Sequence, residues 1–211
     1  MLTPLPSPSS TEKSIRVIAD TDCYCECDDQ YCIAHMLMTP RFDIKGLIAE
    51  QYGERPGEDT EQKSYEEIQN IVHLMGLDGK VNILHGAPHA LPDTHTPVES
   101  EGARLIIKEA LQDDPRPLFV CCQGAATNIA SAYLMEPKIA AKITVIWIGG
   151  GAYPTGGWEF NQKNDLNAAR ILFQSDMPLW QVPMNVYSTM KVSFFELINH
   201  VYPCGEIGRY L

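Results

Sequence analysis

The sequence predicts an α/β fold in which helices cover both faces of an open, mostly parallel, Rossmann-like sheet. Short runs of apolar and β-branched residues alternate along the chain with segments whose apolar residues recur at helical spacing. The strand candidates are continuously apolar rather than alternating, which is typical of parallel strands buried on both faces. The 211 residues, with 45% hydrophobic content, suffice for one substantial domain.

The first four elements fall between residues 14 and 76. A buried strand is expected at 14–19 (SIRVIA), and the helix DDQYCIAHMLM follows at 28–38. A second apolar run, FDIKGLIA, predicts a strand at 42–49. The segment 58–76 is an amphipathic helix, because its apolar residues keep helical spacing until a glycine, a common helix stop, ends the pattern.

The same alternation continues through the middle of the chain. Apolar runs predict strands at 80–84 (KVNIL), 117–122 (PLFVCC) and 142–148 (KITVIWI). Between them, the segments 98–111 and 127–135 have helical spacing. This order of strand, helix and strand is that of successive βαβ units, which build a parallel sheet.

The last expected elements are a helix at 165–175, with Asp165 as its N-cap, and a short strand at 179–183. Residues 1–13, rich in proline and serine, lack the order of a signal peptide and are expected to form a disordered lead. No apolar run reaches the length of a membrane span. Residues 14–211 contain no visible repeat or linker, so a single domain is expected there.

The charge balance excludes some classes of partner. The formal net charge is −11 and the pI is about 4.9, with no run of lysine and arginine, which disfavours binding to nucleic acids or anionic membranes. A small neutral or cationic ligand, or a divalent cation, fits this charge. The number of cysteines, seven, is odd, and Cys121 and Cys122 are adjacent in an apolar strand. Both observations favour reduced thiols in a cytoplasmic protein over a framework of disulfides.

The most informative loop follows the first strand, where an open parallel sheet places its ligand site. Asp22 ends that strand, and Asp28 and Asp29 begin the next helix, so the short loop between them can bring the carboxylates together. Clustered carboxylate oxygens suit a hard cation such as Ca²⁺ or Mg²⁺, which cancels their repulsion. The plain alternative is an acidic turn at a helix N-terminus.

A thiolate site is a second alternative in the same stretch. Cys23, Cys25 and Cys27 are followed by Cys32 and His35, a C-x-C-x-C pattern before C-x-x-H. Two features disfavour zinc: the last two residues fall on a predicted helix, and no second C-x-x-C pair exists. Loop thiols without a metal are the simpler interpretation.

Four motifs, in order along the chain, resemble those of the inosine-uridine-preferring nucleoside hydrolases. DTD…DDQ at 20–30 is similar to the family's N-terminal aspartate motif, in a D-x-D-x-x-x-E-x-D-D-Q variant. HGAPHAL at 85–91 resembles its G-x-x-x-P-L turn, and GAATNIA at 124–130 its G-P-L-T-N-I-A loop. The segment 147–183 looks like its M-G-G-G…E-F-N…D-P-E-A-A region. The resemblance implies the nucleoside hydrolase-like fold.

The resemblance also implies a Ca²⁺ site. By position in the motifs, Asp22 would bind calcium and act as general base on the attacking water. Asp29 would be a second calcium ligand, and Thr127 would lend its backbone carbonyl to the ion.

The same resemblance implies contacts to a nucleoside or ribosyl substrate. Asp28 would hold a ribose hydroxyl, and Glu159 and Asn161 would hydrogen-bond the sugar. The expected reaction is hydrolysis of the N-glycosidic bond of a ribonucleoside, with dimers or tetramers as the expected assembly. The alternatives are a non-catalytic calcium- or sugar-binding member of the fold and, less favoured, a metal-dependent phosphohydrolase, because no basic residue in the motifs is placed to hold phosphate.

Some residues depart from the family pattern. The loop between Asp22 and Asp28 is CYCEC, longer than usual and with Glu26 inside. The family's last calcium ligand lies in a C-terminal His-Asp pair, whereas His200 here is followed by Val201. The sequence as given is therefore expected to lack the family's C-terminal segment, to bind calcium weakly and to be a poor or inactive hydrolase.

Overall fold

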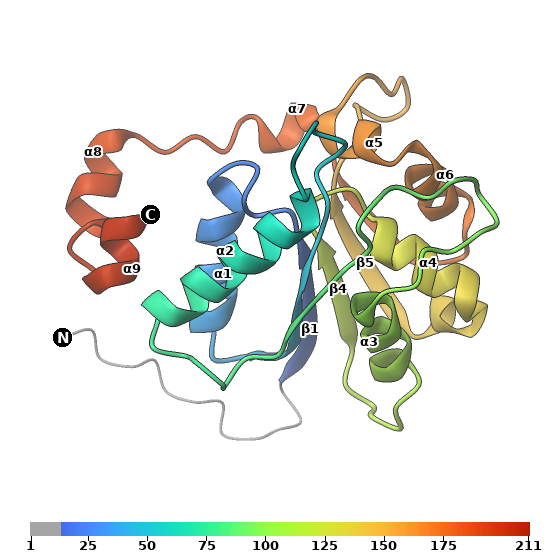
Figure 1. Cartoon of the computed structure of the whole chain (residues 1–211), viewed down its shortest axis with the longest axis horizontal. Coiled ribbons are helices and arrows are strands. Elements are labelled where there is room, and N and C mark those ends of the chain that lie inside the picture. Colours follow the sequence, from blue (N-terminus) through green and yellow to red (C-terminus); the bar gives the residue numbers. More distant parts are fainter. Residues whose placement is uncertain (1–13) are drawn as a thin grey trace.

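The computed structural model describes residues 14–211, and the expected lead at 1–13 lies outside the described residues. A six-stranded sheet with the order β3-β2-β1-β4-β5-β6 forms its centre (Figure 1). Every neighbouring pair of strands is parallel, so the predicted open α/β sheet is confirmed. The strands are β1 (Ile15–Thr21), β2 (Phe42–Ala49), β3 (Ile83–Leu84), β4 (Leu118–Cys122), β5 (Ile143–Ile148) and β6 (Leu179–Val182).

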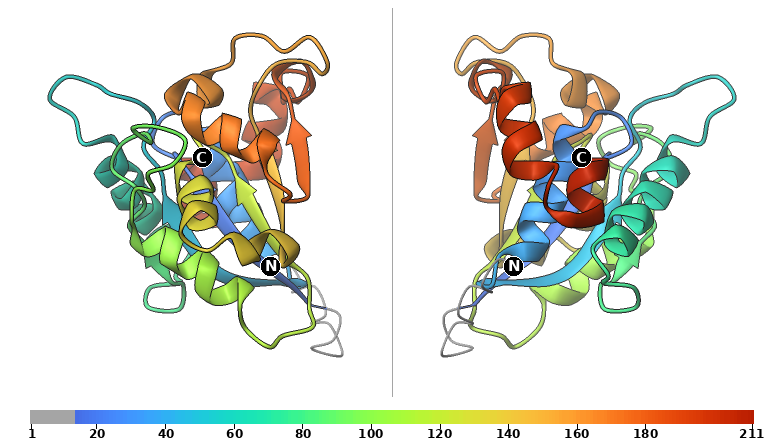
Figure 2. Two further views of the ribbon diagram at one scale, coloured as in Figure 1. Left: turned by 90° about the vertical axis from the view of Figure 1, so that its right-hand side faces the viewer. Right: turned by 90° about the vertical axis from the view of Figure 1, so that its left-hand side faces the viewer.

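Helices cover both faces of the sheet, as the sequence predicts (Figure 2). One face carries α1 (Asp28–Met38) and α2 (Thr60–Leu74). The other carries α3 (Glu101–Ala110), α4 (Thr127–Met135), the 3₁₀ helix η2 (Pro137–Ala141) and α6 (Leu166–Gln174). Successive side chains of a strand point to opposite faces, so each face has its own apolar core.

The strand order reverses between β1 and β4, because β2 and β3 lie to one side of that pair and β5 and β6 to the other. Asp20 of β1 is in register with Cys122 of β4. Past the strand ends, Gln123 N donates to Asp20 O at 2.8 Å, and Glu50 N donates to Thr21 O at 2.8 Å. Ligands of open α/β sheets bind in the crevice at such a reversal, and this crevice receives the acidic loop.

Element boundaries agree closely with the sequence pattern, with one exception. The expected strand at 80–84 shortens to β3, where only Ile83 and Leu84 pair with β2. This strand lies at the edge of the sheet, so it has a single neighbour to hold its backbone. Before β3, the backbone carbonyl of Asn82 still accepts from Leu47 N at 2.9 Å.

Several helical segments were not expected from the sequence. Two of them, α5 (Phe160–Asn164) and α7 (Met184–Tyr187), lie above the carboxyl edge of the sheet (Figure 1). Beyond α7 the chain runs out to α8 (Phe194–Glu196), the π-helical turn η3 (Leu197–Val201) and α9 (Gly205–Tyr210). The last of these packs against α2, where Tyr210 Oη donates to Glu67 Oε1 at 2.8 Å. Within the described part of the chain, no helix is long and apolar enough to cross a membrane.

Candidate functional site

The predicted pair Asp22 and Asp29 meets in the structure. Asp22 follows β1 and Asp29 lies in the first turn of α1, and both side chains are buried. Thr21 Oγ1 donates to Asp29 Oδ2 at 2.6 Å. Burial raises the pKa of Asp22 to about 7, a shift opposed by its hydrogen bond with Asp29. Burial and the charge of Asp22 raise the pKa of Asp29 well above its ordinary value. Two buried carboxyls this close need a shared proton or a bound cation.

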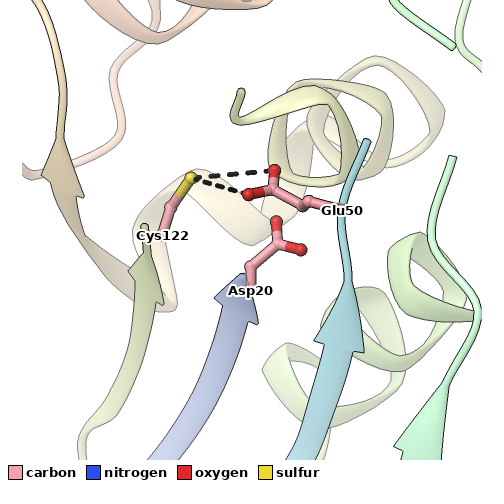
Figure 3. Close-up of side chains that lie close together, drawn as sticks. All are labelled: Asp20, Glu50 and Cys122. Atoms are coloured by element: carbon pink, nitrogen blue, oxygen red, sulfur yellow. Dashed lines mark hydrogen bonds between the residues drawn. The ribbon is translucent and has the colours of Figure 1, made fainter. Parts of the chain in front are cut away.

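A second buried group is formed by Asp20 of β1, Glu50 just after β2 and Cys122 of β4, whose side chains converge (Figure 3). The Cys122 thiol donates to both Glu50 carboxylate oxygens at 3.8 Å. Asn128 Nδ2 donates to Asp20 Oδ1 at 2.9 Å, whereas Asp20 Oδ2 finds no donor among the described residues. Burial raises the pKa of Asp20 to about 7 and that of Glu50 well above its ordinary value. One proton shared between these two carboxyl groups satisfies the unpaired oxygen.

Gly124 lets the two acidic groups approach the end of β4. A Cβ atom at this position would lie 2.5 Å from Glu50 Oε2 and 2.9 Å from Asp22 Cγ. Any larger residue would displace one of these carboxylates. The glycine of the sequence motif 124–130 therefore has a steric reason to be there.

The acidic cavity is a cleft of about 50 Å³ above Asp22 and Asp29. This volume holds an ion with a few waters. The cavity combines five carboxylates with polar, apolar and aromatic groups at or next to the ends of β4, β5, α5 and α7. Its lining is Asp22, Cys25, Glu26, Asp28, Asp29, Gln123, Ile148, Glu159, Phe160, Asn161 and Tyr187.

Five of the six predicted site residues line this cavity, and Thr127 does not. Thr127 is the first residue of α4, and its Oγ1 donates to Asp165 Oδ2 at 2.8 Å and accepts from Gln51 Nε2 at 3.3 Å. The residue of this segment that does line the cavity is Gln123, whose Oε1 is buried and has no partner among the described residues. Gln123 Oε1 is therefore a further candidate ligand beside the predicted residues, and the predicted role of the Thr127 carbonyl stays a prediction.

The predicted sugar contacts Glu159 and Asn161 are already heavily engaged within the protein. Glu159 is the N-cap of α5, where its carboxylate accepts from the backbone N–H groups of Asn161 and Gln162. Asn161 Nδ2 donates to Gln123 O at 2.7 Å and to Ile148 O at 2.9 Å. These bonds fix α5 across the ends of β4 and β5 and leave Asn161 Oδ1 as the free acceptor of that side chain.

The cysteines do not gather into a thiolate centre. Among the described residues, the one set of three potential metal-binding side chains is Asp20, Glu50 and Cys122. Cys23 is buried and donates to Ser64 O at 3.5 Å, whereas His35 is exposed on the far side of α1. Burial raises the pKa of Cys25 to about 12, so its thiol stays protonated at neutral pH.

A larger, open cavity of about 840 Å³ lies between the loops after β2 and β3. Its carboxylates, Glu54, Glu58 and Asp59, are exposed, and Asp59 already caps α2 by accepting from Gln62 N. The smaller cavity is the better candidate for chemistry because it alone contains the buried carboxyl pair. The large cavity borders the same carboxyl edge and offers room for a second part of a ligand.

The sequence profile of the family described as "Inosine-uridine preferring nucleoside hydrolase" matches residues 17–203. The chain therefore belongs to this family, and the family expected from the sequence is confirmed.

Known proteins have similar sequences or folds. The pyrimidine-specific ribonucleoside hydrolase RihA of Citrobacter koseri is 27% identical over 192 residues, which is 78% of this chain and 59% of that protein. The purine-preferring ribonucleoside hydrolase from Gardnerella vaginalis superposes with a TM-score of 0.69 at 23% identity, covering 87% of this chain and 65% of that one. The effector protein XOO4466 superposes with a TM-score of 0.74 at 18% identity, and the match covers 97% of this chain and 65% of that one. This chain spans about 59% of the length of the curated relatives.

Proposed function

We propose that the protein hydrolyses the N-glycosidic bond of a ribonucleoside to release the base and ribose. The observation that carries this proposal is the acidic cavity at the β1/β4 reversal, where Asp22, Asp28 and Asp29 line one cleft with Asn161. Family membership supports the same reaction. Cleavage of this bond passes through a state with positive charge on the sugar, which surrounding carboxylates stabilise.

The residues present fit a calcium ion. Asp22 and Asp29 are buried and adjacent, and Gln123 Oε1 beside them lacks a partner among the described residues. All of these donors are oxygens, which Ca²⁺ prefers. Bound there, the ion would offset the repulsion of the carboxylates and make a bound water more acidic.

Asp22 is the proposed general base. Its carboxylate lines the cavity, where it can reach a water that attacks the sugar. A water held between Asp22 and the sugar would lose its proton to the carboxylate as it attacks. Asp28 at the mouth of the cavity would orient a ribose hydroxyl, and Asn161 Oδ1 would accept from another.

The rival function is binding without catalysis. The effector XOO4466 has the same fold, and a fold alone does not fix a function. Ribose release from a panel of purine and pyrimidine nucleosides, measured with added calcium, separates the two classes. The expected result is ribose release from at least one nucleoside and no turnover of p-nitrophenyl phosphate. Phosphate release without ribose release would overturn the proposal.

Two further properties belong to this proposal. Cytoplasmic residence is supported by the seven cysteines, all of which are free thiols in the structure. Assembly into dimers or tetramers rests on the family resemblance, and sedimentation at micromolar concentration tests it.

A further inference from the structure

The Glu159 carboxylate has no remaining capacity for a strong contact with a sugar. It is 1% exposed, and four donors surround it. Gly150 N and Gln162 N donate to Oε2 at 2.8 and 2.9 Å. Asn161 N and the Tyr187 hydroxyl donate to Oε1 at 3.1 and 2.9 Å. The carboxylate therefore orients protein groups, and one of these groups is a side chain that reaches the cavity.

That side chain is Tyr187, the last residue of α7. The helix is anchored to the loop after β5, where Met184 N donates to Gly150 O at 3.0 Å. Its first turn is held by Pro183, whose carbonyl accepts from Tyr187 N at 3.1 Å. Tyr187 lines the acidic cavity, and these backbone contacts hold it there.

The hydrogen-bond roles at this phenol are fixed. Its proton is directed to Glu159 Oε1, so the oxygen offers only lone pairs to the cavity. Burial and the charge of Glu159 raise its pKa, with Glu26 and Asp28 adding to the shift, so the group stays a neutral phenol. Several other side chains at the cleft, among them the carboxylates of Asp22 and Asp28, are acceptors as well. Such a lining selects a ligand that donates several hydrogen bonds, as a sugar does.

We propose that the Tyr187 hydroxyl accepts a hydrogen bond from one ribose hydroxyl and so makes the sugar contact that the sequence predicts for Glu159. Glu159 then acts as a positioning residue that orients the phenol. This inference rests on the proposed function, because it names a substrate contact of the same cavity.

The test compares wild type with Tyr187→Phe on a ribonucleoside that the wild type cleaves and on its 2′-, 3′- and 5′-deoxy analogues. Tyr187→Phe is expected to lower kcat/KM on the ribonucleoside by about 10-fold, the usual effect of losing one buried hydrogen bond. On the analogue that lacks the contacted hydroxyl, the two proteins are expected to have equal kcat/KM. Tyr153→Phe, at an exposed tyrosine outside the cavity, is the matched control and is expected to match wild type on every substrate.

A merely structural role predicts the same loss on all four substrates, and that outcome would overturn the inference. An undiminished rate on the ribonucleoside would overturn it as well. If wild type releases no ribose, the proposed hydrolysis fails on its own, and calorimetric binding of D-ribose still tests Tyr187. Weaker ribose binding by Tyr187→Phe than by wild type would then support the contact. Equal affinities, or no binding by either protein, would exclude it.

Discussion

At the scale of single residues, the site depends on buried oxygen atoms that lack enough donors. Asp22 and Asp29 are adjacent and buried, and Gln123 Oε1 and Asp20 Oδ2 have no partner among the described residues. Unsatisfied buried acceptors are costly, and in this arrangement a cation or a proton relieves them. Cys25 beside them remains a thiol, because burial raises its pKa to about 12.

Calcium binding is expected to be weak, so protein purified without chelator and then equilibrated with calcium is expected to contain calcium on elemental analysis. Asp29→Asn removes one anionic ligand and is expected to weaken calcium binding by at least ~10-fold, measured by calorimetry. Cys25→Ser is the matched control within the same cavity and is expected to bind calcium as wild type does. Stoichiometric zinc that is lost on Cys25→Ser would replace the carboxylate site with a thiolate one.

The sequence predicts residue positions better than residue roles. Motif spacing places Asp22, Asp28, Asp29, Glu159 and Asn161 at one cavity, and the structure brings these five together. The sequence does not predict that the Glu159 carboxylate already accepts four hydrogen bonds within the protein. The four donors belong to residues 150, 161, 162 and 187, which are partly far apart in the chain. Only the folded chain brings those groups together. The proposed role of Tyr187 on α7 could not be predicted from the sequence for the same reason.

At the scale of elements, apolar periodicity was a good guide wherever a segment packs against the sheet. The boundaries of α1, β2 and α4 match the expected ranges, since each of these elements contributes residues to a core. The short helices α5 and α7 were missed, because five and four residues are too few to show a period. Their positions are set by caps and loop contacts, which a pattern of apolar residues does not report.

Asp165 is expected to be the most costly N-cap to remove. Its carboxylate accepts from Ala168 N within α6, and also from Leu91 N and Thr127 Oγ1, so it joins three elements. Asp165→Ala should lower the free energy of unfolding by about 2–4 kcal/mol, from a lost cap together with unpaired buried donors. Asp59→Ala, at the exposed cap of α2, should cost only about 1 kcal/mol. Urea denaturation of both variants measures the difference, and equal losses would contradict the joining role.

At the scale of the whole molecule, a buried acidic centre in a protein of net charge −11 makes stability depend on pH. Burial raises the pKa values of Asp20 and Asp22 to about 7, and those of Asp29 and Glu50 also rise. Between their unfolded and folded pKa values the native state binds more protons than the unfolded state. Its stability therefore falls as pH rises through this range.

Chelator-treated protein is accordingly expected to be more stable at pH 5.5 than at pH 8, by on the order of 2 kcal/mol in urea denaturation. Added calcium should stabilise the protein more at pH 8 than at pH 5.5, because protons compete for the same carboxylates. If chelator-treated protein instead becomes more stable as pH rises from 5.5 to 8, the prediction is wrong. These carboxyl groups would then be ionised in the native state and stabilised by neighbouring groups.

The central claim is that Asp22 activates the attacking water at the acidic cavity. The measurement is ribose release by Asp22→Asn beside wild type, at saturating nucleoside and calcium. The substitution keeps the shape of the side chain and removes its charge and basicity, so kcat is expected to fall by at least ~10²-fold. Asp113→Asn, at an exposed loop residue outside the cavity, should keep the wild-type rate. A folded Asp22→Asn protein that retains most of the activity of an active wild type would contradict the claim.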